Sequence, residues 1–209
     1  MELTGIETRV IGSLIEKELT TPDYYPLSLN ALLNACNQKS NRNPVMNLNE
    51  QEVLQALSAL KEKGLAVFSS GQGQRITKYR HYADHYFSLD HRELSLLAVL
   101  FLRGAQTLGE LRLRTQRMYD FSSLEEVQDY LTKLSEREEP LVKLLPRQPG
   151  QKEQRYIHLL NVDYYEDKTV EKNSPQMDEL IELKETVTIL QKELQELRED
   201  FYKLKAELE

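Results

Sequence analysis

Hydrophobic residues along the first 160 positions recur every three or four residues, which is the period of amphipathic helices. In the first half of this region, Thr4 and Glu7 form a capping box before one helical stretch, and Ser28 caps a second. Asn49 and Glu52 cap a third stretch in the same way. We expect the apolar stripe of the third helix to face the core, and its members are Val53, Leu54, Leu57 and Leu60.

Two short segments follow the third helical stretch, and their apolar residues no longer recur with the helical period. Residues 65–68 and 76–79 flank a glycine-containing turn, so they predict a β-hairpin. The segment 37–44, between the second and third helical stretches, is polar, and we expect it to lie outside the core.

The same order of signals then returns. Asp90 precedes a first helical stretch that ends at Gly104, Thr107 caps a second, and Ser123 with Glu126 repeats the capping box of the third. Residues 141–145 and 155–160 again predict a hairpin. Equivalent positions lie 74 to 86 residues apart, as expected for a duplicated supersecondary unit. The core stripe of this third helix comprises Leu124, Val127, Leu131 and Leu134.

These patterns predict a mainly α fold with small β-hairpin wings, in the α+β class. Three short helices followed by a hairpin are typical of a winged helix-turn-helix. We therefore predict two tandem winged-helix domains, 1–86 and 87–160, a linker at 161–175, and a coiled-coil helix at 176–209.

The predicted coiled coil has apolar residues at alternating spacings of three and four. A parallel dimer would place Glu193 opposite Arg198 and Asp200 opposite Lys205, whereas an antiparallel dimer would oppose like charges. The pattern favours a parallel homodimer, and a higher parallel oligomer or packing against the rest of the chain remains open. The predicted dimerisation residues are Leu180, Leu183, Val187, Leu190, Leu194, Leu197, Phe201 and Leu204.

The net charge of −7 arises from the last part of the chain. Residues 1–86 and 87–160 each contain equal numbers of acidic and basic side chains, while residues 161–209 contain 14 acidic and seven basic ones. The single cysteine, Cys36, excludes an internal disulfide and has the neighbours of a buried apolar residue. Neither a signal peptide nor a membrane span is visible, so we expect a cytoplasmic protein without a membrane partner.

Nucleic-acid binding has support from the predicted turns and wings, which are rich in basic residues. Such residues can contact phosphate, although solvated charges paired with nearby acids give the same pattern. The third helices are acidic, with Glu50 and Glu52 in one and Glu125 and Glu126 in the other, which favours a protein partner. A dimeric protein that binds double-stranded DNA is thus the first hypothesis, and a protein-interaction scaffold is the alternative. The candidate nucleic-acid-binding residues are Lys39, Arg42, Arg75, Lys78, Arg80, Arg112, Arg114, Arg117, Arg147, Lys152 and Arg155.

An enzyme is the weakest hypothesis. His81, His85 and His91 lie near Asp84 in the sequence, but their positions on a strand and a connector do not imply a shared metal site. No phosphate-binding glycine loop, nucleophile elbow or zinc-type cysteine spacing is present. We expect no catalytic residues, no metal and no cofactor.

Four sequence motifs also resemble a known family. They are RVIGSLIEKELTTP at 9–22, YPLSLNALLNACNQKSNR at 25–42, PVMNL at 44–48, and LRGAQT at 102–107. These runs are similar to the YceH-like proteins of bacteria, over roughly residues 1–160. The resemblance implies a tandem winged-helix fold and a coiled tail, and it offers no catalytic or ligand-binding residues to transfer.

Overall fold

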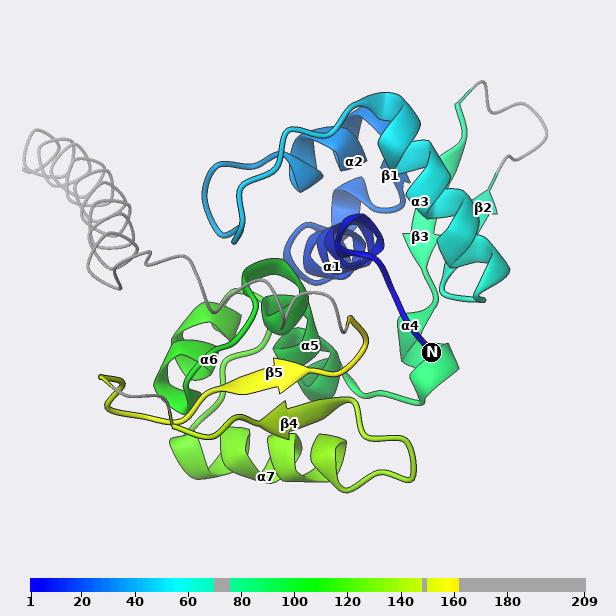
Figure 1. Ribbon diagram of the computed structural model, residues 1–209. Coiled ribbons are helices and arrows are strands. Elements are labelled where there is room, and N and C mark those ends of the chain that lie inside the picture. The colour runs from blue at the N-terminus through cyan, green and yellow to red at the C-terminus, as the bar shows by residue number, and fades with distance from the viewer. Residues whose placement is uncertain (70–75, 148–149, 162–209) are drawn as a thin grey trace, which may run out of the picture. The chain divides into compact units, whose positions relative to one another are not determined.

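The computed structural model describes residues 1–69, 76–147 and 150–161 of the chain (Figure 1). Within these residues the protein is mainly helical with small antiparallel sheets, which confirms the α+β class. The helices are α1 (Gly5–Thr20), α2 (Leu29–Cys36), α3 (Glu50–Glu62), α4 (Ala83–Phe87), α5 (His91–Arg103), α6 (Leu108–Thr115) and α7 (Leu124–Ser135), with a 3-10 turn at Pro22–Tyr24. The strands are β1 (Leu27–Ser28), β2 (Ala66–Ser69), β3 (Lys78–His81), β4 (Val142–Leu144) and β5 (Tyr156–His158).

The helix starts agree with the capping residues read from the sequence. Thr4, Asn49 and Thr107 each accept a hydrogen bond from the third backbone N–H of their helix, and each receives the reciprocal glutamate bond. Asp90 caps α5 in the same manner. The capping box predicted at Ser123 is only half formed, because Glu126 binds the backbone and hydroxyl of Ser122 instead of returning to Ser123.

The sheets contain a strand that the hydrophobic pattern did not predict. In the first repeat, β1 lies between α1 and α2 and pairs with β3, which gives the antiparallel order β1-β3-β2. In the second repeat, Gln106 lies between α5 and α6 and forms an equivalent bridge with Tyr156 of β5. Both repeats therefore have the order helix, short extended segment, helix, helix and hairpin. The short helix α4, also not predicted, links them.

The two repeats pack on each other within one compact unit, Met1–Glu166. Helices α1 and α5 lie side by side at its centre (Figure 1). Their approach is close at Gly12, where an added Cβ would lie 2.9 Å from the Cβ of Phe101 and 3.0 Å from the Cγ of Leu102. The backbone N–H of Asn43 also donates to the carbonyl of Leu102 at 2.8 Å, so the α2–α3 loop rests on the second repeat.

Most of the predicted core stripe is buried, but two leucines are not. Leu54 is 40% exposed and Leu124 is 43% exposed, so their assignment to the core is wrong. On α3, the buried face follows Val53, Leu57 and Leu60, and the next residue after Val53 is rotated by about 100° away from it. Leu124 is the first residue of α7 and precedes the buried face of that helix.

The linker at 161–175, apart from Asn161, and the coiled-coil segment at 176–209 lie outside the described residues. The same holds for the eight predicted dimerisation residues from Leu180 to Leu204. None of the helices in the described part of the chain is both long enough and apolar enough to cross a membrane.

Candidate nucleic-acid interface

Arg42 differs most from its predicted role. Its guanidinium forms a two-pronged ion pair with the carboxylate of Glu16, with N–O distances of 3.0 and 2.6 Å, and its Nε donates to the carbonyl of Ala35. The Arg42 side chain is fully buried and that of Glu16 is 14% exposed. Burial raises the pKa of Glu16, but the hydrogen bonds and charge of Arg42 outweigh it and hold that pKa below its ordinary value. Arg42 is therefore an internal structural residue, and the expectation that 37–44 lies outside the core is wrong at this position.

The other candidates of the first repeat lie nearer to solvent. Lys39 is exposed in the loop between α2 and α3. On β3, Lys78 and Arg80 point to the same side of the strand, while Tyr79 and His81 point to the buried side. Arg75 lies outside the described residues. Among the candidates that the structure describes in this repeat, Lys39, Lys78 and Arg80 therefore reach solvent.

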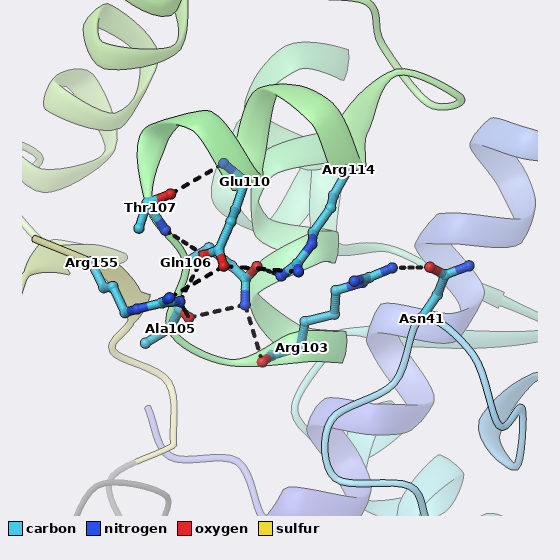
Figure 2. Close-up of polar contacts among 8 residues, drawn as sticks. All are labelled: Asn41, Arg103, Ala105, Gln106, Thr107, Glu110, Arg114 and Arg155. Carbon is cyan, nitrogen blue, oxygen red and sulfur yellow. Dashed lines mark hydrogen bonds and ion pairs between the residues drawn. The ribbon is translucent and has the colours of Figure 1, made fainter. Parts of the chain in front are cut away.

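In the second repeat, a polar network surrounds Glu110 at the start of α6 (Figure 2). The carboxylate of Glu110 accepts hydrogen bonds from the backbone N–H of Thr107 at 2.8 Å and from the Arg155 guanidinium at 2.7 and 3.2 Å. Arg114 lies 3.8 Å from the same carboxylate and also donates to the side chain of Gln106. Arg155 further binds the carbonyl of Ala105 at 2.9 Å.

This network joins three parts of the molecule. Arg155 precedes β5, Glu110 and Arg114 belong to α6, and Gln106 forms the bridge to β5. Arg103, at the end of α5, donates to Asn41 in the loop of the first repeat (Figure 2). The arginines at 114 and 155 therefore hold the hairpin and helix together, and only part of each side chain reaches solvent.

The remaining candidates of the second repeat are exposed. The Arg112 guanidinium donates to the carbonyls of Phe121 and Ser122 at 3.1 and 2.9 Å and so ties α6 to the turn before α7. Arg117 lies in that turn, and the other exposed basic residues of this group, Arg147 and Lys152, flank the tip of the β4–β5 hairpin.

Charge is sharply divided within the second repeat. The segments 103–117 and 141–160, which comprise the end of α5, α6 and the hairpin, contain eight Lys or Arg residues and two acids. The segment 118–140, which contains α7, has two Lys or Arg residues and seven acids. The equal totals of the repeat thus conceal a basic helix-and-hairpin region and an acidic third helix.

Two glutamates in the first turn of α7 have lowered pKa values. Hydrogen bonds from its own backbone N–H and from the Ser123 hydroxyl keep the pKa of Glu125 below its ordinary value. Hydrogen bonds from the hydroxyl and backbone N–H of Ser122 lower the pKa of Glu126 in the same way. Both carboxyls are ionised near neutral pH, and they would repel a nearby phosphate.

Two of the histidines, His81 and His85, approach different oxygens of the Asp84 carboxylate. His81 is buried on β3, contacts the carboxylate of Glu18, and has its Nδ1 3.6 Å from Asp84. His85 is exposed and lies 3.7 Å from the other oxygen of Asp84. In the described ranges, no group of three or more His, Cys, Asp or Glu side chains is arranged to hold a metal ion.

Cys36 and His158 are buried in the core. Cys36 is buried, as expected from its neighbours in the sequence, and this burial raises the pKa of its thiol to about 11. Burial also lowers the pKa of His158 to about 4, and its ring packs edge-on against Phe101 with a centroid distance of 4.9 Å. Both side chains are therefore uncharged near neutral pH.

The sequence did not identify Glu16 and Glu110 as the partners of the candidate arginines. The i, i+4 spacing of Glu110 and Arg114 on one helix was a usable signal for an ion pair. Glu16 and Arg42 lie 26 residues apart, and no local pattern links them.

Comparison with known proteins places the chain among bacterial relatives. A family model described as "Protein of unknown function, DUF480" matches residues 3–151. A UPF0502 protein of Geotalea daltonii is 58% identical over 157 residues, which cover 75% of this chain and 72% of the relative. UPF0502 proteins of Pelobacter propionicus and Shewanella piezotolerans are 50% and 45% identical, and each alignment covers 95% of this chain. The corresponding coverage of those two relatives is 94% and 95%.

Proposed function

The chain belongs to the DUF480 family, as its resemblance to bacterial proteins led us to expect, and we propose that it binds double-stranded DNA through tandem winged helices. The winged-helix assignment is supported by the sheet order β1-β3-β2 and by the matching bridge between Gln106 and Tyr156. In such domains the hairpin and the turn before the third helix commonly contact the DNA backbone.

The division of charge in the second repeat carries this proposal. Basic residues gather on the helix-and-hairpin region, and the exposed members are Arg112, Arg117, Lys143, Arg147 and Lys152. We name these five residues the basic surface. Arg155 and Arg114 both contact Glu110, and the Arg155 bond fixes the hairpin against α6. Phosphate contacts made here do not require α7 to enter a groove.

The first repeat contributes a second set of contacts in this proposal. Lys39, Lys78 and Arg80 are at least partly accessible and lie on the loop before α3 and on its hairpin. Arg42 has no part in binding, because its guanidinium is buried against Glu16.

Dimerisation is also part of the proposal and rests on the heptad pattern of 176–209. Two copies would double the number of phosphate contacts, and effective concentration would then strengthen weak individual sites. Analytical ultracentrifugation of the full chain and of a variant with Leu190→Asp and Leu197→Asp tests this point. We expect a dimer and a monomer, respectively.

The test of DNA binding is a fluorescence-anisotropy titration of the full chain against a mixed-sequence duplex at several salt concentrations. Three single charge reversals, Arg117→Glu, Arg147→Glu and Lys152→Glu, should each weaken binding and reduce the salt slope, by about 0.9 for each phosphate that the variant no longer neutralises. Lys133→Glu on α7 is the matched control, because it changes the charge equally in the acidic region. If all four variants weakened binding equally, the proposal that DNA binds at the basic surface would be contradicted.

A protein-docking function is the second candidate, and the exposed acids of α7 favour it. Glu125 and Asp129 lie on the outer side of that helix and suit a basic partner segment better than DNA. Absence of duplex binding even at low salt, together with a partner whose binding is abolished in a Glu125→Gln, Asp129→Asn variant, would favour this function.

A further inference from the structure

The third helices of the two repeats present different side chains at equivalent positions. The pairs Glu52-Val53 and Glu126-Val127 correspond, so Gln51 corresponds to Glu125 and Gln55 to Asp129. The side chains at these two pairs of positions, 51 and 125, and 55 and 129, are all exposed. Residues four apart lie on the same side of a helix. One side of α3 therefore carries two neutral amides where α7 carries two carboxylates.

The amides of α3 are available for a ligand. Within the part of the chain that the structure describes, neither Gln51 nor Gln55 forms a side-chain hydrogen bond. The amide of α7 differs, because Gln128 donates to the hydroxyl of Tyr156 at 2.6 Å and to that of Thr132 at 3.3 Å. The side-chain amides of Gln51 and Gln55 can therefore form hydrogen bonds with a bound molecule.

Apolar and hydroxyl groups complete this side of α3. Leu54, which is 40% exposed, and Ser58 lie beside the two glutamines. Together with Ala59 and Glu62 they line an open hollow of about 420 Å³. Glu52, by contrast, is held at the helix start by its 2.7 Å bond to the backbone of Asn49.

The amides, the hydroxyl and the leucine match the major groove of DNA, whereas the carboxylate of Glu62 belongs to the last residue of α3, about two turns beyond Gln55. A glutamine amide can both donate to and accept from adenine, a serine hydroxyl accommodates several base edges, and an apolar side chain can contact the thymine methyl group. The groove is wide enough to admit a helix. The carboxylates at the equivalent positions of α7 would instead face phosphates of the same charge.

We propose that α3 is the base-reading helix of this protein and that Gln51 and Gln55 select adenine in an A·T-containing site. The inference rests on the proposed DNA binding and adds a division of labour to it. The first repeat reads sequence through α3, and the basic surface of the second repeat holds the backbone. Lys78 and Arg80 on the adjoining hairpin provide backbone contacts beside α3.

The experiment is a selection of duplexes with a randomised core by the full-length protein. The wild type should enrich a motif that contains A·T pairs, and the Gln51→Ala, Gln55→Ala variant should no longer enrich it. We expect the affinity of this variant for the selected duplex to fall by about tenfold or more. Its affinity for a scrambled duplex and its salt slope should remain unchanged.

Two further variants control for folding and for position. Gln51→Glu with Gln55→Asp places the α7 side chains on α3 and should abolish the motif, while Glu125→Gln with Asp129→Asn should retain it. All variants change exposed residues, and circular dichroism verifies that they fold. If the wild type binds DNA but enriches no motif, or if the alanine variant keeps the motif, base reading by α3 is overturned while DNA binding stands. If the wild type binds no duplex, both proposals are overturned.

Discussion

The two repeats share one order of elements but differ in where they place charge. The second helix of the first repeat, α2, has no charged residue, whereas α6 contains Glu110, Arg112 and Arg114. The third helices differ in the opposite direction, because α3 exposes amides at the positions where α7 exposes acids. The two repeats therefore differ on their surfaces, although a side chain caps the start of the third helix in each. We infer separate roles for the two copies.

The ion pairs of the repeats show the same divergence. Arg42 and Glu16 form a buried pair in the first repeat, and Arg155 and Glu110 form a pair in the second whose side chains are 25% and 28% exposed. Each pair fixes the second helix of its repeat. Arg42 connects Glu16 of α1 with the carbonyl of Ala35 in α2, and Arg155 connects the hairpin with Glu110 of α6. Their exposure differs, so their removal should affect stability to different degrees.

The largest effect is expected for Arg42→Ala. The change leaves Lys17, at 3.5 Å, as the remaining charged partner of the largely buried Glu16 carboxylate, and we expect the free energy of unfolding to fall by about 3 kcal/mol at pH 7. Chemical denaturation measures this loss. The double variant Glu16→Met, Arg42→Met should recover most of it, because no unpaired charge remains.

The pH dependence of this loss has a defined sign. The folded-state pKa of Glu16 is lowered, so the ion pair stabilises the protein above the ordinary value of 4.5 and loses this effect as the pH falls through the folded-state pKa. The difference between wild type and Arg42→Ala should therefore shrink below about pH 4.5. A constant difference down to pH 3 would show that Glu16 is not the source.

His158 and its equivalent His81 provide a second comparison. His81 contacts Glu18, whereas His158 packs against Phe101, and burial lowers its pKa from 6.5 to about 4. Because the unfolded chain binds the proton more tightly, stability should fall as the pH decreases from about 6.5 to about 4, by at most about 1.4 kcal/mol per pH unit. His158→Phe should remove this component, and denaturation at a series of pH values measures it. An unchanged pH profile would contradict it.

A smaller loss of stability is expected for a substitution at Gly12, where the two repeats meet. Gly12→Ala places a Cβ 2.9 Å from Phe101 and should force α1 and α5 apart, at a cost of about 2 kcal/mol. The control is Gly109→Ala on α6, where the nearest atom is the Thr107 hydroxyl at 3.9 Å. That change should be neutral or slightly stabilising, because alanine has the higher helix propensity. Equal Tm values for the two variants would contradict close packing at Gly12.

The smallest effect is expected for Arg155→Ala. Its ion pair with Glu110 is partly screened by solvent, so we expect a loss of about 1 kcal/mol or less in stability. A loss comparable to that of Arg42→Ala would remove the distinction between the two pairs. Thermal melts of both variants under the same conditions make this comparison.

Local signals predicted the parts of the fold that depend on neighbouring residues. Capping at Thr4, Asn49 and Thr107 involves atoms three positions apart, so the sequence alone identified these helix starts. The two-residue strand β1 has no such pattern, because it exists only by pairing with β3 about 50 residues later. The periodicity of hydrophobic residues does not reveal nonlocal pairing of this kind.

The candidate interface was predictable in composition but not in accessibility. The sequence predicted a group of basic residues as candidates, but it could not separate Arg42 and Arg155, which form ion pairs, from the exposed Arg117 and Lys152. That separation depends on Glu16 and Glu110, whose positions follow from tertiary packing. The exposed Leu54 was missed for a related reason, since a leucine beside a core stripe has the same hydrophobicity on either side.

The most direct test of the divided roles is photocrosslinking from equivalent positions of the two third helices. A photoreactive amino acid replaces Gln55 in one full-length variant and Asp129 in the other, and each is irradiated in the presence of a duplex that the wild type binds. We predict a crosslink to DNA from position 55 and none from position 129. A crosslink from position 129 and none from position 55 would contradict the assignment of base reading to the first repeat.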